Sequence, residues 1–201
     1  MSHLKQHASD ESGFSLVELL VVLAVTSVVV ITFSSFFTNY LILYSNYQKD
    51  GSNFTELAQQ SQRIAQVLRG VTDIVSANDN DLVAYSYFSP VDSKVSQVHY
   101  YLNTDKTILY VDVTAMTADP PSGTPITNSK KTYTLLSKFY QPAGGKLFNY
   151  TDASATLIAT PVAEQHSIIG IQVNLAESAS HTQNGQNLSI NVSLRNRKTN
   201  L

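Results

Sequence analysis

The chain has 201 residues, no cysteine and a formal net charge of −2. Without cysteine it has neither a disulfide framework nor a zinc site that uses thiolates. A near-neutral chain with no broad basic segment is poorly suited to neutralising phosphates, so nucleic acid is not an expected partner.

The first feature in chain order is an apolar segment close to the N-terminus. From Leu19 to Ile31 only Thr26 and Ser27 interrupt the aliphatic residues, and no glycine or proline occurs between Phe14 and Asp50. A helix that crosses a hydrocarbon core of about 30 Å needs about 20 residues. The segment therefore predicts a membrane-spanning helix.

Glu18 lies at the head of this segment and needs an explanation. A carboxylate in a membrane helix costs about 2.5–3.5 kcal/mol on insertion scales, so it usually has a partner and a purpose. A secretory signal peptide needs a basic start and a small-residue cleavage site after the apolar run. The start has Lys5 against Asp10 and Glu11, and residues 34–37 offer no such site. A plain membrane anchor explains the length of the segment but leaves Glu18 unexplained.

Residues 13–23, which read GFSLVELLVVL, closely resemble the cleavage and methylation motif of type IV pilins and pseudopilins. The resemblance implies that Gly13 is the last leader residue and that a membrane aspartyl prepilin peptidase cuts after it. Phe14 would become the N-methylated first residue of the mature chain. Glu18 would be the acid at the fifth mature position, and the family implies that it pairs with the Phe14 amine of a neighbouring subunit.

The resemblance also has departures. The residues before Gly13 are acidic (Asp10, Glu11) where family leaders are basic, and Ser35 lies where many major pilins carry a proline. The missing proline favours a minor pilin or a pseudopilin over a bulk filament subunit. The basic ending at residues 194–198 is similar to that of some minor pilins and J-type pseudopilins.

A second helical pattern follows the apolar segment. Apolar residues recur at three-, four- and seven-residue intervals, with glutamines and arginines largely on the opposite face. They are Leu57, Ile64, Leu68, Val71 and Val75. We expect a weak point at residues 51–53 and a helix that reaches about Val75.

From Asp81 the periodicity changes to two, which predicts strands. We expect them at residues 82–88, 95–102, 107–114, 132–140, 156–160, 168–175 and 188–194. Residues 103–106 suit a hairpin turn, and residues 119–128 and 178–187 suit loops. The predicted fold is α+β, with a long N-terminal helix packed on one antiparallel sheet.

Other signals point to no chemistry of their own. The five histidines are scattered, and no zinc-binding or nucleophile motif occurs, so we expect no enzyme activity, no cofactor and no metal site. Residues 78–81 (NDND) are rich in oxygen ligands but lack the pattern of an EF-hand, and we interpret them as a turn that ends the helix. Eleven tyrosines include Tyr40, Tyr44 and Tyr47, which suit a membrane-interface belt. Those on strands suit a core or a recognition surface.

Together these features predict three parts: a leader at 1–13, a transmembrane and filament-core helix at 14–48, and a globular α+β domain at 49–201. The predicted function is that of a minor pilin or pseudopilin, a structural subunit of a type IV pilus or related secretion or competence filament. The expected partners are other pilin subunits, prepilin peptidase, the inner-membrane assembly platform and the cytoplasmic membrane. After assembly the subunit would lie in a filament at the cell surface. The alternatives are a pilus-mounted adhesin with a tyrosine-rich binding domain and a plain membrane-anchored domain.

Overall fold

A computed structural model describes residues 15–89, 94–141, 144–177 and 186–195 of the chain. The chain divides into two compact units, residues 1–47 and residues 48–201. One helix, α1 (Leu16–Arg69), contributes to both units. The expected weak point at residues 51–53 is wrong, since these residues are helical.

The described part of the first unit is a helix with apolar side chains on every side. Four of its hydroxyl groups are bonded within the helix. Thr26 Oγ1 donates to the carbonyl of Val22 at 2.5 Å, and Ser27 Oγ donates to that of Leu23 at 2.7 Å. Thr32 and Thr38 repeat the arrangement with the carbonyls four residues earlier. Because these donors are satisfied internally, they do not oppose burial in an apolar environment.

In the second unit α1 is amphipathic and its apolar face is buried, as predicted. Leu57, Ile64 and Leu68 are almost fully buried, whereas the glutamines and arginines between them are largely exposed. The helix ends at Arg69 and not near Val75, because Gly70 N–H bonds to the Val67 carbonyl in a tightened last turn. Val75 lies instead on an edge strand.

Within the described residues, nine strands form two antiparallel sheets where we expected one. The five-stranded sheet has the order β1-β2-β3-β4-β5, and the four-stranded sheet has the order β7-β6-β8-β9. The strands of the first are β1 (Asp73–Ala77), β2 (Asp81–Ser86), β3 (Ser96–Leu102), β4 (Leu109–Ala115) and β5 (Lys131–Leu136). Those of the second are β6 (Phe148–Thr151), β7 (Leu157–Ile158), β8 (Gly170–Glu177) and β9 (Gln186–Ser193). Single 3-10 turns occupy Thr127–Ser129 and Gln165–Ser167.

The strand predictions are confirmed for most elements and wrong for three. β1 and β6 were not predicted, and β5 ends at Leu136 where a strand to residue 140 was expected. The hairpin turn at residues 103–106 is confirmed. Asn103 Oδ1 accepts the N–H groups of Thr107 and Ile108, and Lys106 adopts a positive φ of 54°. Of the predicted polar loop at 178–187, residues 178–185 lie outside the described residues, and β9 already begins at Gln186.

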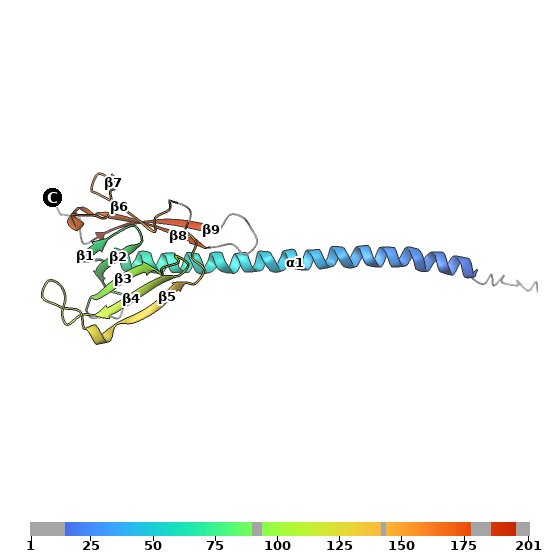
Figure 1. Cartoon of the computed structure of the whole chain (residues 1–201), viewed down its shortest axis with the longest axis horizontal. Coiled ribbons are helices and arrows are strands. Elements are labelled where there is room, and N and C mark those ends of the chain that lie inside the picture. The colour runs from blue at the N-terminus through green and yellow to red at the C-terminus, as the bar shows by residue number, and fades with distance from the viewer. Residues whose placement is uncertain (1–14, 90–93, 142–143, 178–185, 196–201) are drawn as a thin grey trace, which may run out of the picture. The chain divides into compact units, whose positions relative to one another are not determined.

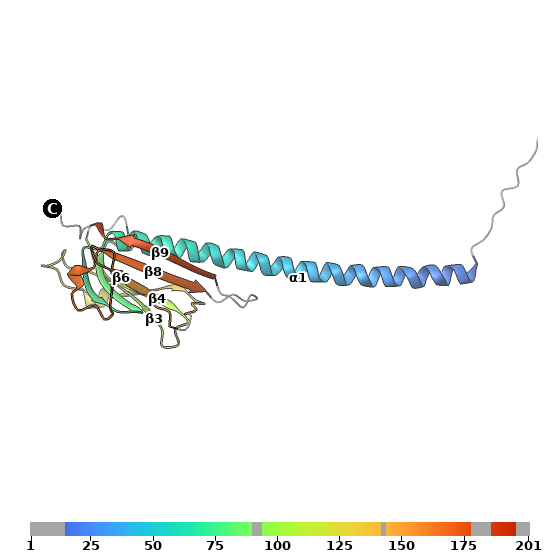
Figure 2. The ribbon, with the colours of Figure 1, turned by 90° about the horizontal axis from the view of Figure 1, so that it is seen from above.

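A single apolar core joins the last part of α1 to both sheets. Figure 1 shows β3 to β5 below this part of the helix and β6, β8 and β9 above it, and the turned view in Figure 2 shows β8 and β9 beside it. The ring of Tyr100 on β3 meets that of Phe148 on β6 edge-on, with centroids 6.4 Å apart. The α+β, pilin-like architecture predicted from the sequence is therefore confirmed.

Replacement of Leu57 by alanine should destabilise this core. Leu57 is fully buried, and such truncations cost about 2–5 kcal/mol because a cavity remains. Thermal unfolding of the full chain in detergent, followed through the β-sheet signal, measures the change. The matched control is Leu43→Ala, the same substitution on an exposed part of the same helix, and it should leave sheet unfolding nearly unchanged. Equal effects of the two changes would contradict this assignment of the core.

Candidate functional site

Two of the three predicted site residues, Gly13 and Phe14, lie outside the described residues. The third, Glu18, is in the first turn of α1 and is exposed. Between Leu16 and Gln48 it is the only side chain among Asp, Glu, Lys, Arg and His. Among the described residues no cation forms an ion pair with it. An acid that stands alone in an apolar segment is suited to a partner supplied from outside the described chain.

The residues around Glu18 form an extended apolar surface. Twenty-one large hydrophobic side chains between Leu16 and Tyr47 are between about half and three-quarters exposed. Soluble monomers rarely expose contiguous apolar patches larger than a few hundred Å². The helix is long enough and apolar enough to cross a membrane. Chemically, this surface can be covered only by lipid or by other apolar helices.

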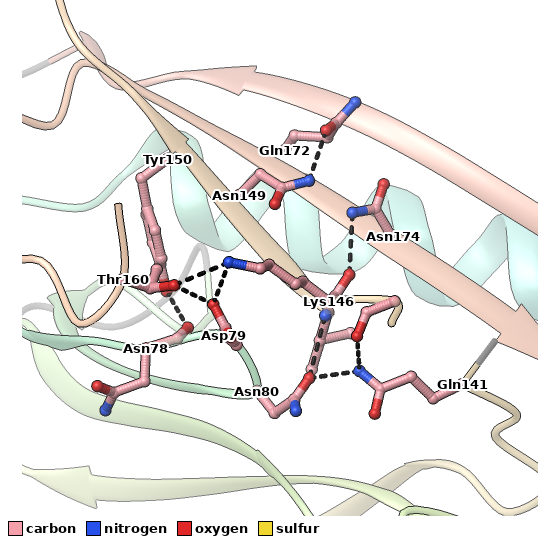
Figure 3. Close-up of polar contacts among 12 residues, drawn as sticks. Asn78, Asp79, Asn80, Gln141, Lys146, Asn149, Tyr150, Thr160, Gln172 and Asn174 are labelled. Carbon is pink, nitrogen blue, oxygen red and sulfur yellow. Dashed lines mark hydrogen bonds and ion pairs between the residues drawn. The ribbon is translucent and has the colours of Figure 1, made fainter. Parts of the chain in front are cut away.

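A second polar cluster lies in the globular unit, around residues 78–81. We interpreted these residues as a turn that ends the helix, and that is wrong, because they connect β1 to β2. Asp79 accepts a hydrogen bond from the Thr160 hydroxyl, and the Lys146 ammonium lies 3.0 Å from Asp79 Oδ1 and 3.1 Å from Thr160 Oγ1. Figure 3 shows these three side chains converging. The hydrogen bond from Thr160 and the charge of Lys146 outweigh burial and lower the pKa of Asp79.

The same turn holds the two sheets together through its neighbours. Asn80 Oδ1 accepts hydrogen bonds from Gln141 Nε2 at 2.6 Å and from the Leu147 N–H at 3.1 Å. The hydroxyl of the buried Tyr150 on β6 donates to the Asn78 carbonyl at 2.9 Å (Figure 3). The donors come from Tyr150 on β6 and from the segments that flank β6 and β7, so the cluster is a structural clamp. In the described part of the chain, no three His, Cys, Asp or Glu residues are grouped to hold a metal ion.

The outer face of the five-stranded sheet carries a third cluster, which is aromatic and acidic. The rings of His99 and Tyr101 stack with centroids 4.6 Å apart, and Tyr110 lies 5.6 Å from Tyr101. His99 Nε2 is 2.5 Å from Asp81 Oδ2. Tyr101 and Tyr110 are partly exposed, whereas Tyr100 on the same strand as Tyr101 is buried in the core.

Asp112 on β4 anchors this third cluster. The carboxylate is almost fully buried and is bonded to Lys130 at 2.5 Å, to the Thr132 hydroxyl at 2.6 Å and to the Tyr101 hydroxyl at 3.3 Å. Burial acts to raise the pKa of Asp112, but the bonds from Lys130 and Thr132 outweigh it, so the pKa lies below its ordinary value. No sequence motif indicated Asp112, because its partners come from two other segments, Tyr101 on β3 and residues 130–132 at the start of β5.

Comparison with known families gives one match. Residues 8–34 fit the family model for the prokaryotic N-terminal methylation motif. A search of curated protein sequences finds no match to the chain. The matched range contains Gly13, Phe14 and Glu18, and it supports a type IV pilin-like N-terminus with a leader, a methylation site and a transmembrane helix. Proteins with this motif are in general cut by a prepilin peptidase and assemble with other pilins, and their role is structural.

The charge on Asp112 should stabilise the globular unit in a pH-dependent way. Because its pKa is lower in the folded chain, its contribution is complete at neutral pH and is lost as the pH falls through the folded pKa. Asp112→Asn should therefore lower the free energy of unfolding by about 1–3 kcal/mol near pH 7, and the difference should shrink in acid. Urea unfolding of residues 48–201 at several pH values measures this effect.

Asp105→Asn is the control for this experiment, since Asp105 is an exposed acid in the turn between β3 and β4. It should change the unfolding free energy little at any pH. A penalty for Asp112→Asn that stays constant down to strong acid would show that lost packing, and not the charge, causes it.

Proposed function

We propose that this type IV pilin-like chain is a minor pilin or pseudopilin, a subunit that enters a filament through the first part of α1. The observation that carries the proposal is the exposed apolar helix with one carboxylate in its first turn. The match of residues 8–34 to the methylation motif supports it. The chain would then have a leader at 1–13, a transmembrane and filament-core helix at 14–48 and a globular domain at 49–201.

The first step of the proposed pathway is processing. A membrane prepilin peptidase cuts after Gly13, and Phe14 becomes the N-terminal, methylated residue. Cleavage removes the acidic residues that precede Gly13 and creates a positive amine at the head of the helix. Phe14 lies four residues before Glu18. Cleavage therefore places a positive charge about one helical turn from the Glu18 carboxylate.

The second step is the transfer of α1 from lipid to the filament, with the inner-membrane assembly platform as the partner. Lipid is as apolar as leucine, so helices gain little from the hydrophobic effect when they leave it for one another. Close packing and polar contacts have to favour the filament instead. Glu18 paired with the Phe14 amine of a neighbouring subunit supplies such a contact, and it sets the axial register because a mismatch leaves a buried charge unpaired.

Processing is tested by the N-terminal residue and intact mass of the membrane-bound protein, with active and with inactive prepilin peptidase. We expect a methylated Phe14 N-terminus with the active peptidase and the leader still attached without it. Gly13→Val should also retain the leader, since the residue at the cut is changed. An unprocessed chain in the presence of active peptidase would favour the plain membrane anchor and would overturn the filament proposal.

Glu18 is tested by Glu18→Leu, which removes the charge and keeps the apolar character of the helix. Membrane insertion should be intact or improved, because the cost of the carboxylate disappears. Incorporation into filaments should fall at least about tenfold, which corresponds to about 1.4 kcal/mol of the pairing energy. Membrane fractionation and immunoblotting of sheared filaments measure the two quantities.

The matched control is Thr26→Leu, which removes a polar side chain from the same apolar helix. Thr26 is bonded to a carbonyl of its own helix, so its loss should affect neither insertion nor incorporation. Filaments that contain the Glu18→Leu chain at the normal level would refute the role proposed for Glu18.

A further inference from the structure

The outer face of the four-stranded sheet carries uncharged polar side chains on three strands. Along β6, β8 and β9 the residues alternate between buried apolar and outward polar positions. The outward positions hold only amides, hydroxyls and small residues: Asn149, Thr151, Gly170, Gln172, Asn174, Ala176, Asn187, Ser189, Asn191 and Ser193. We refer to these residues as the amide face. None of these positions carries an ionisable side chain.

The five-stranded sheet of the same unit shows that this is a local property. Its outer face carries Asp81, His99 and Asp112, with Lys130 paired to Asp112. Asp81 and His99 show that outward strand positions of this chain can carry partly exposed ionisable side chains. The amide face has no ionisable side chain on three adjacent strands. Solubility alone does not account for this absence of charge, since charged side chains would serve it equally well.

The amides of this face are arranged in rows. Asn149, Gln172 and Asn191 are register partners across β6, β8 and β9, and strands lie about 4.8 Å apart. Asn149 Nδ2 donates to Gln172 Oε1 at 2.9 Å (Figure 3). In the next row Ser189 donates to Asn174 Oδ1. Asn174 Nδ2 also donates to the Lys146 carbonyl at 3.0 Å. Each carboxamide has two N–H donors and an oxygen with two lone pairs, so these bonds use only part of the hydrogen-bonding capacity of the row.

Two open hollows of about 560 Å³ each lie over the amide face, one toward each end. The first is lined by Asn149, Asn174 and Ser189, together with the half-exposed ring of Tyr140. The second is lined by Thr151, Gly170, Gln172 and Asn191, together with the exposed side chain of Leu157. At Gly170 a Cβ atom would lie 2.4 Å from Thr151 Oγ1, so the absence of a side chain keeps the second hollow open.

Among the described residues, the two charged side chains that line the hollows are bonded to other groups. Lys146 borders the first hollow, but its ammonium is bonded to Asp79 and Thr160. Asp152 borders the second hollow, and its Oδ1 accepts the N–H groups of Ser154 and Thr156 in a turn. A ligand on this face therefore meets neutral donors and acceptors between one aromatic and one aliphatic side chain.

We propose that the amide face binds a neutral polysaccharide. Sugar hydroxyls both donate and accept, as carboxamides do, and neither partner has a charge to desolvate. The Tyr140 ring and Leu157 offer apolar contact for the C–H faces of sugar rings at the two ends. Nucleic acid or an anionic membrane would need exposed cations. A protein partner would need an apolar anchor at the centre, where this face has amides.

This site goes beyond assembly, since it uses the globular unit alone and does not depend on processing at Gly13. The test uses the full chain in phospholipid nanodiscs, free of maltoside detergents. Titration calorimetry with chitohexaose, cellohexaose and maltohexaose measures binding, and an oligogalacturonate of the same length is the charged comparison. We expect saturable binding of at least one neutral chain and none of the oligogalacturonate. The absence of binding to all three neutral chains, or stronger binding of the charged one, would overturn the proposal.

The variant Asn191→Ala tests whether the sugar binds on the amide face. Asn191 is exposed on the edge strand β9, so its loss should leave the unfolding temperature unchanged and weaken sugar binding about tenfold. The matched control is Gln97→Ala, an outward-facing amide on the other sheet, which should bind sugar normally. Equal affinities of the two variants would contradict the site. Light scattering on the same samples gives a further check, since self-association that Asn191→Ala abolishes would make the face a contact between copies and would refute a sugar site.

Discussion

An apolar helix that its own chain leaves uncovered is the constraint on which the rest of this structure depends. Between Leu16 and Tyr47 the side chains are exposed on all sides, and four of the hydroxyl groups are bonded back to the helix. Such a helix is poorly suited to water, and under the proposed function it would pass from lipid to other helices without crossing an aqueous phase. Glu18 is the only acidic or basic side chain in this stretch, so it is the group whose charge pairing would differ between the two environments. In the proposed filament, specificity would therefore rest on this residue, while the apolar residues would supply general affinity.

The second half of α1 is covered by its own chain, in contrast to the first half. From Leu57 to Leu68 the apolar residues gather on one side and enter the core shared by both sheets. The clamp around Asp79 and Asn80 then ties the turn between β1 and β2 to the four-stranded sheet. Side-chain polar contacts therefore fix how the sheets meet, where two flat apolar faces alone would leave their relative position poorly specified.

The sequence predicted the elements that depend on local pattern and missed those that depend on distant partners. The apolar segment, the Leu57–Leu68 face and the turn at 103–106 follow from spacing and from turn chemistry, which neighbouring residues determine. Val75 continued the helical spacing, yet Gly70 ends the helix before it, and residues 73–77 pair with β2. The strand at 148–151 is short, and its pairing with β8 across more than twenty residues leaves no mark in its own composition. For the same reason one sheet was expected where two exist.

The same distinction applies to the candidate sites. Glu18 was evident because a carboxylate conflicts with its local surroundings, whereas Asp79 and Asp112 look ordinary until folding brings Lys146 and Lys130 to them. Asp79 and Asp112 both lie at structural contacts. Their ion pairs hold strands and turns of the globular unit together. Part of the amide face could be predicted, since residues 187–193 (NLSINVS) alternate between polar and aliphatic side chains. Its lack of charge becomes notable only when it is compared with the five-stranded sheet, whose outer face carries ionisable residues. A chain with few charged residues can in this way keep one surface free of charge, and that surface then discriminates among ligands by hydroxyl geometry and not by electrostatic attraction.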